Sequence, residues 1–177
     1  MSYKKHVDPL DALGAVYENM YENVAEKLHK AKDKSGPLIH ELVDEAKEKV
    51  KDIEEVTEED AEKLGVWLKR DLDEVTNYLS ETENAFKDWL GFETSLIKNE
   101  FIEALLDTAD KTTLALLRMK ENAHEPYSYH TGEIAGFGTL ICDECGEKLH
   151  FHKAGHIPPC PKCHKTSFHR IQINYAR

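Results

Sequence analysis

Four cysteines near the end of the chain have the spacing of a metal site. They form two Cys-x-x-Cys pairs, Cys142 with Cys145 and Cys160 with Cys163, and 14 residues separate the pairs. Each pair makes a tight turn that directs two thiolates at one point. Two pairs therefore supply four sulfurs to a tetrahedral site with no open position. We expect Zn²⁺ in a structural role, with rubredoxin-type iron as the less favoured alternative because four thiolates also suit iron.

The residue after each pair predicts the shape of the turn. Gly146 follows the first pair and His164 follows the second. A positive φ at this position turns backbone amides towards sulfur. Glycine adopts that conformation freely, and histidine is one of the few other residues enriched in it. These residues predict two rubredoxin-like knuckles. A thioredoxin-like redox pair is not favoured, because no βαβ pattern surrounds either pair.

The histidines near the knuckles raise the question of a second metal site. Those considered are His150, His152, His156, His164 and His169. If they lie on a strand, His150 and His152 share one face, which is the spacing that a bidentate site would use. A solvated face beside the knuckles accounts for the same residues without a metal, and we favour that interpretation.

The pattern of the sequence changes near residue 125, which predicts two domains, 1–125 and 126–177. Only four of the 34 acidic residues lie in the second part, so the net charge of -11 comes from the first. No apolar run approaches the roughly 18 residues of a membrane-spanning helix, and the first residues lack the apolar segment of a secretory signal. We expect a cytoplasmic protein, whose reduced thiols favour metal binding over disulfides.

Residues 1–125 have helical periodicity. Pro9 and Gly36 mark helix starts, and Thr57-Glu-Glu-Asp60 resembles a capped start. Apolar residues recur every three or four positions. The stripes are Leu10, Leu13, Tyr17, Met20, Val24, Leu28 and Ala31; Ile39, Leu42, Ala46, Val50 and Ile53; Ala61, Leu64, Leu68, Leu72, Val75, Leu79, Phe86 and Trp89; and Ile97, Phe101, Leu105, Ala109, Leu116 and Met119. Such narrow stripes predict an acidic antiparallel coiled-coil hairpin or bundle, and they suit a homodimer as well as a monomer.

Residues 126–177 have the pattern of short strands. Strand-like segments lie at 139–141, 148–152 and 168–173. A segment of this size is too small to depend on a hydrophobic core alone, so the metal is expected to stabilise it. The predicted fold is mainly α, with a helical hairpin or bundle followed by a small β zinc ribbon.

The cysteines lie in a longer pattern that resembles a known family. The pattern comprises Gly132-Glu133, Gly138-Thr-Leu-Ile-Cys142-x-x-Cys145-Gly146, Ile157-Pro-Pro-Cys160-Pro-x-Cys163 and Phe168-x-Arg170. It is similar to the bacterial zinc-ribbon family of YbeL-like proteins, as are Thr57-Glu-Glu and the run Leu68-Lys-Arg-Asp-Leu72 in the acidic first part. The resemblance implies an acidic helical region, a C-terminal ribbon and four zinc ligands. It implies no particular activity.

A helical N-terminal region followed by a four-cysteine ribbon also resembles rubrerythrin, a di-iron peroxidase. That interpretation needs two Glu-x-x-His motifs on facing helices. Glu26 with His29 and Glu121 with His124 have the spacing. Both motifs lie near the C-terminal ends of their helices, which an up-and-down bundle would place far apart. We therefore interpret them as exposed pairs and keep the iron protein as a low-ranked alternative.

The sequence favours an interaction protein over an enzyme. It has no nucleophile elbow, phosphate-binding loop or dinucleotide fingerprint, and a closed four-cysteine site cannot activate water. We expect a protein partner that binds the helices or the ribbon. The alternative is a regulator associated with nucleic acid or the ribosome through the ribbon. The residues for that role would be Lys148, Lys153, Lys162, Lys165, Arg170, Arg177, Tyr127, Phe151 and Phe168. We rank this alternative second, because the acidic first part of the chain should repel phosphates.

Overall fold

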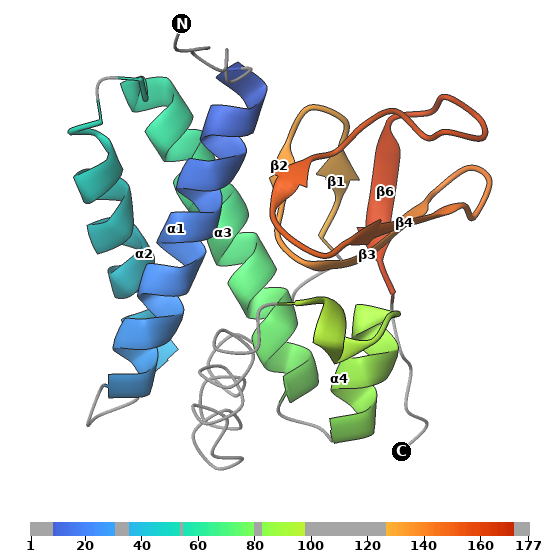
Figure 1. The fold of residues 1–177 in the computed structure, drawn as a ribbon, viewed down its shortest axis with the longest axis horizontal. Coiled ribbons are helices and arrows are strands. Elements are labelled where there is room, and N and C mark those ends of the chain that lie inside the picture. The colour runs from blue at the N-terminus through green and yellow to red at the C-terminus, as the bar shows by residue number, and fades with distance from the viewer. Residues whose placement is uncertain (1–8, 31–35, 54, 80–82, 98–126, 172–177) are drawn as a thin grey trace, which may run out of the picture.

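A layer of helices packs against a small β ribbon (Figure 1). The computed structural model describes residues 9–30, 36–53, 55–79, 83–97 and 127–171. The prediction of a helical region followed by a small C-terminal sheet is confirmed. The predicted stripe from Phe101 to Met119 lies outside the described residues, whereas Ile97 at its start is buried in the core.

The helical layer consists of α1 (Pro9–Lys30), α2 (Gly36–Val50) and α3 (Glu58–Leu79). Successive helices run in opposite directions, with α2 on the side of α1 and α3 away from the ribbon (Figure 1). The buried faces reproduce the periodicity of the sequence: Tyr17, Met20, Val24 and Leu28 in α1; Ile39, Val43, Ala46 and Val50 in α2; and Ala61, Leu64, Leu68, Leu72 and Val75 in α3. Leu42 lies at the edge of its face and is only half-buried.

The start of α3 has the predicted cap. The Thr57 hydroxyl accepts a hydrogen bond from the Asp60 amide at 3.1 Å, and its carbonyl accepts one from the Ala61 amide at 3.0 Å. Acidic residues fill the first turn, where they face the positive end of the helix dipole. After α3 come α4 (Glu83–Leu90) and the 3₁₀ turn η1 (Thr94–Leu96), which lie at one end of the ribbon (Figure 1).

The ribbon contains two antiparallel sheets. In the larger sheet β1 (Tyr129–His130), β6 (Ser167–Arg170), β3 (Gly138–Cys142) and β4 (Lys148–Phe151) are neighbours in that order. In the smaller one β2 (Ile134–Ala135) pairs with β5 (Gly155–His156). The three predicted strands are present as β3, β4 and β6. The other three are two residues long, too short to show a period of two.

The helices and the ribbon share one hydrophobic core. Ile134 and Phe137 of the ribbon belong to the same buried cluster as the helix faces. A second cluster lies inside the ribbon and includes Leu140, Phe168 and buried cysteine side chains. The predicted boundary at residue 125 lies outside the described residues, so the division into two domains stays a prediction. Within the described part of the chain, no helix is long and apolar enough to span a membrane.

Candidate metal centre

The two knuckles have the same backbone geometry. In the first, the Cys142 amide donates to the Glu147 carbonyl and the Cys142 carbonyl accepts from the Gly146 amide, at 2.9 and 3.0 Å. In the second, Cys160 makes the equivalent bonds with Lys165 and His164, both at 2.9 Å. This repetition shows that each Cys-x-x-Cys pair folds as one local unit.

The residues after the pairs adopt the predicted conformation. Gly146 has a φ of 73° and His164 a φ of 62°, and His164 is the one non-glycine residue with positive φ in the described ranges. The left-handed conformation is costly for most side chains but less so for histidine. The prediction of two rubredoxin-like turns is therefore confirmed at the level of the backbone.

The knuckles bring the four predicted cysteines together. Their sulfurs all lie within 4.8 Å of one another. The Cys142 and Cys163 sulfurs are 3.5 Å apart, and those of Cys145 and Cys160 are 3.6 Å apart. All four thiols are free. Four thiolates bound tetrahedrally at about 2.3 Å would have sulfur–sulfur separations of about 3.8 Å, so this donor set fits one zinc ion.

The surroundings of the four sulfurs shift the pKa values of Cys160 and Cys163 in opposite directions. Burial disfavours the thiolate of Cys160, but hydrogen bonds from the backbone amides of Cys163 and Lys162 and from the facing thiols of Cys145 and Cys163 together lower the pKa of Cys160 to about 7. At Cys163 the backbone amide of Lys165 favours the thiolate. Burial and the facing sulfurs oppose it more strongly and raise the pKa of Cys163 to about 12. A positive ion between the sulfurs would favour the thiolate of Cys163.

Comparison of the sequence with known proteins identifies the family of this chain. A family model described as a zinc-ribbon containing domain matches residues 26–172. The chain belongs to this zinc-ribbon family. Relatives from Escherichia coli strains K12, O6:H1 and O157:H7 are each named "Uncharacterized protein YbeL". Each is 27% identical over 165 residues, covering 91% of this chain and 97% of the relative. No solved structure matches the chain. The predicted resemblance to YbeL-like proteins is confirmed.

A second group of residues, which sequence reasoning did not predict as a site, joins the ribbon to the helices. Asp71 of α3 is 1% exposed. It accepts hydrogen bonds from the Gly136 amide at 2.7 Å, the Tyr129 hydroxyl at 3.1 Å and the Tyr17 hydroxyl. The guanidinium of Arg170, 2% exposed, lies 3.6 Å from the same carboxylate. We call Arg70, Asp71, Tyr129 and Arg170 the junction cluster.

Arg70, which precedes Asp71 on α3, completes the junction cluster. It donates to the Glu133 carboxylate at 2.5 Å and to the Ile134 carbonyl at 3.1 Å. Its guanidinium carbon lies 3.8 Å from the centre of the Tyr129 ring. Burial opposes the charge of Arg70, but Asp71, Tyr129 and Glu133 hold its pKa above the usual value. The arginine therefore stays charged where the helices meet the ribbon.

The sequence held a signal for the junction cluster. Asp71 lies three residues after Leu68 and four before Val75, so it falls on an apolar stripe where an unpaired charge would be costly. Arg70 and Asp71 belong to the run that carries the family resemblance in the helices, and Arg170 ends the pattern in the ribbon. Nothing in the spacing indicated that these segments meet.

The structure changes the set of residues considered for nucleic-acid binding. Arg170 is buried and donates to the carbonyls of Phe137 and Gly136, both at 3.3 Å. Phe168 is fully buried. The expectation that these two residues contact nucleic acid is wrong, because neither is available to a phosphate or a base. Arg177 lies outside the described residues.

Three of the ribbon histidines contact other side chains. His150 and His152 both contact the Phe92 ring, at 6.0 and 4.5 Å between ring centroids. His169 lies 2.5 Å from the Asp143 carboxylate. Among residues placed by the structure, the four cysteines form the only group of three or more metal-ligating side chains.

The structure describes one of the two Glu-x-x-His motifs considered for a di-iron site, the one on α1. Glu26 is exposed and pairs with Lys30 one turn later on α1. Glu121 and His124 lie outside the described residues. Glu26 behaves as the exposed surface residue that the sequence predicted.

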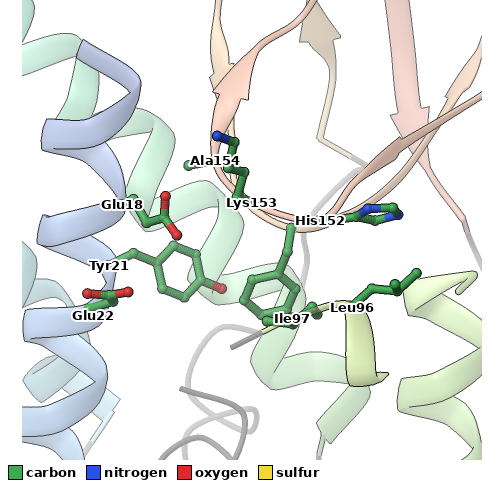
Figure 2. A pocket seen from close by; sticks show the side chains of 10 residues that line it. Glu18, Tyr21, Glu22, Leu96, Ile97, His152, Lys153 and Ala154 are labelled. Carbon is green, nitrogen blue, oxygen red and sulfur yellow. The ribbon is translucent and has the colours of Figure 1, made fainter. Parts of the chain in front are cut away.

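A cavity of about 400 Å³ lies where the ribbon meets α1. Glu18, Tyr21 and Glu22 of α1 line one wall, Leu96 and Ile97 another, and the residues after β4 a third (Figure 2). Its walls come from both layers, so the cavity exists only while the ribbon is docked on the helices.

Proposed function

We propose that the protein binds one zinc ion per chain through Cys142, Cys145, Cys160 and Cys163. The observation that carries this proposal is the convergence of four free thiols within 4.8 Å in two matching knuckles. The zinc-ribbon family to which the chain belongs supports zinc over iron. Metal analysis of protein purified without added metal tests it. About one zinc per chain is expected, and iron or no metal would contradict the proposal.

We propose further that the zinc is structural and that the protein is not an enzyme. Four thiolates fill the four positions of a tetrahedral zinc ion, so no position is left for a water or a substrate. The buried charges of the junction cluster hold the two layers together and face one another rather than a cleft. The zinc should therefore act in folding and not in catalysis.

The biological role that we propose is the binding of a protein partner with a basic surface. The motivating observation is the net charge of -11, all of which comes from the first part of the chain. The outer faces of α2 and α3 present many carboxylates, among them Glu45, Glu48, Glu58 and Glu62. Salt should weaken such binding, because exposed charges are screened within about 10 Å at moderate ionic strength.

A binding assay separates this role from the nucleic-acid alternative. The zinc-loaded chain is immobilised and exposed to cell extract with and without nuclease treatment. A protein that is retained after nuclease treatment and released by salt supports the proposal. Retention that disappears with nuclease would favour the nucleic-acid role instead. Sedimentation of the purified chain over a range of concentrations tests whether it forms a homodimer.

A further inference from the structure

Two ribbon strands run from the predicted metal centre to the helices. Strand β3 has Cys142 at one end and Gly138 at the other. Strand β6 is its antiparallel neighbour, with Cys142 opposite Phe168 and Leu140 opposite Arg170. Strand β6 carries Arg170 and pairs with β3, which carries the metal ligand Cys142. The position of Arg170 relative to the helices therefore depends on the same pair of strands as the position of that ligand.

At the far end of these strands, one carboxylate connects both layers. Asp71 of α3 accepts hydrogen bonds from Tyr17 of α1 and from two groups of the ribbon, the Gly136 amide and the Tyr129 hydroxyl. Arg170 places its positive charge beside it at 3.6 Å. A buried carboxylate is stable only while such partners are present, because burial without them costs several kcal/mol.

Close packing at the ribbon end leaves little freedom for Arg170. Gly138 has a φ of 129°, and a Cβ there would come within 2.5 Å of an Arg170 nitrogen and 3.3 Å of the Trp89 ring. Trp89 of α4 is fully buried, and its ring lies 6.2 Å from that of Phe137. The indole thus reports directly on whether the ribbon is docked.

The size of the ribbon connects this packing to the metal. A segment of this length is too small to depend on its own hydrophobic core, so metal binding and packing on the helices should both contribute folding free energy. If the ribbon loses the metal, it loses the framework that presents Arg170 of β6, Tyr129 of the neighbouring β1 and the Gly136 amide to Asp71. Coupling of this kind is reciprocal, so the contacts with Asp71 must also favour metal retention.

We propose that metal binding at the four cysteines is coupled to docking of the ribbon on the helices through Asp71 and Arg170. Loss of the metal releases the ribbon and exposes the face of α1 and α3 formed by Tyr17, Tyr21, Arg70 and Asp71. This inference rests on the proposed zinc binding. It goes beyond that proposal because it gives the metal control over a surface formed largely by α1 and α3.

Tryptophan fluorescence of the full chain tests the coupling. The chain has two tryptophans, Trp67 and Trp89. The variant Trp67→Phe leaves Trp89 as the single reporter. Removal of zinc with a chelator should shift its emission to the red and increase its quenching by acrylamide, and added zinc should reverse both changes. Unchanged Trp89 emission in protein shown by metal analysis to have lost its zinc would overturn the coupling. Protein that never contains zinc would instead refute the proposed function.

A zinc competition assay tests the reciprocal effect. Asp71→Asn should weaken the apparent zinc affinity by roughly 5- to 150-fold, the usual range of coupling between sites. Asp44→Asn is the matched control, since Asp44 is a half-exposed carboxylate of α2 that pairs with Lys69. An Asp71→Asn variant that folds and keeps the affinity of the wild type would overturn the coupling. If that variant does not fold, the Trp89 measurement decides the question.

Discussion

The substitution Asp71→Asn should destabilise the folded protein. It keeps the size of the side chain but removes the negative charge that lies beside the Arg170 guanidinium. It also leaves one acceptor oxygen where the carboxylate serves the Gly136 amide and two tyrosine hydroxyls. The loss is therefore partly electrostatic and partly the loss of hydrogen bonds.

The magnitude follows from burial. Removing one partner of a buried ion pair typically costs about 3–5 kcal/mol. Arg170 keeps two carbonyl partners and Arg70 keeps Glu133, so the lower end, about 3 kcal/mol, is expected here. For a chain of this size that corresponds to a fall in melting temperature of roughly 6–12 °C.

Urea unfolding at saturating zinc, followed by circular dichroism, measures this effect. The midpoint should fall while the slope of free energy against denaturant stays the same, which identifies a change in stability. Asp44→Asn serves as the control, because exposed pairs contribute about 0–1 kcal/mol. A loss below about 1 kcal/mol for Asp71→Asn would refute the reasoning, since a buried carboxylate cannot lose its charge at so small a cost.

Two further predictions concern backbone conformation and pH. Gly138→Ala should destabilise the protein clearly more than Gly132→Ala in thermal melts, since both positions have positive φ but only a Cβ at Gly138 meets the Arg170 guanidinium; equal losses would contradict this. Burial, together with the Asp71 charge, raises the pKa values of Tyr17, Tyr21 and Tyr129. The folded chain therefore holds these phenols protonated, so stability should fall as pH rises above the unfolded value of about 10. Absorbance of phenolate should show them ionising only as the chain unfolds, and ionisation before unfolding would contradict this.

Local sequence predicted the parts of the structure that depend on local physics. Helix faces follow a period of 3.6 residues, and the cap at Thr57 depends on contacts three and four residues away. The knuckles could be predicted for the same reason. Each needs two cysteines and one residue tolerant of positive φ, all within five positions.

The junction cluster could not be predicted because its contacts join distant segments. Asp71 meets Gly136 across 65 residues of sequence and Tyr129 across 58. Arg170 looked like a basic surface residue of the ribbon, since charge alone does not distinguish a phosphate ligand from a buried ion pair. For this reason the nucleic-acid hypothesis wrongly treated Arg170 as a surface residue. A charged residue on an apolar stripe, as at Asp71, is the signal that would have indicated a buried partner.

The central claim is that four cysteine sulfurs hold one zinc ion, and X-ray absorption at the zinc edge tests it most directly. We predict a single shell of four sulfur neighbours at about 2.3 Å. The spectrum of Cys160→Ser should lack that shell or show reduced metal content. Nitrogen or oxygen neighbours in the wild-type spectrum, or iron in place of zinc, would contradict the account.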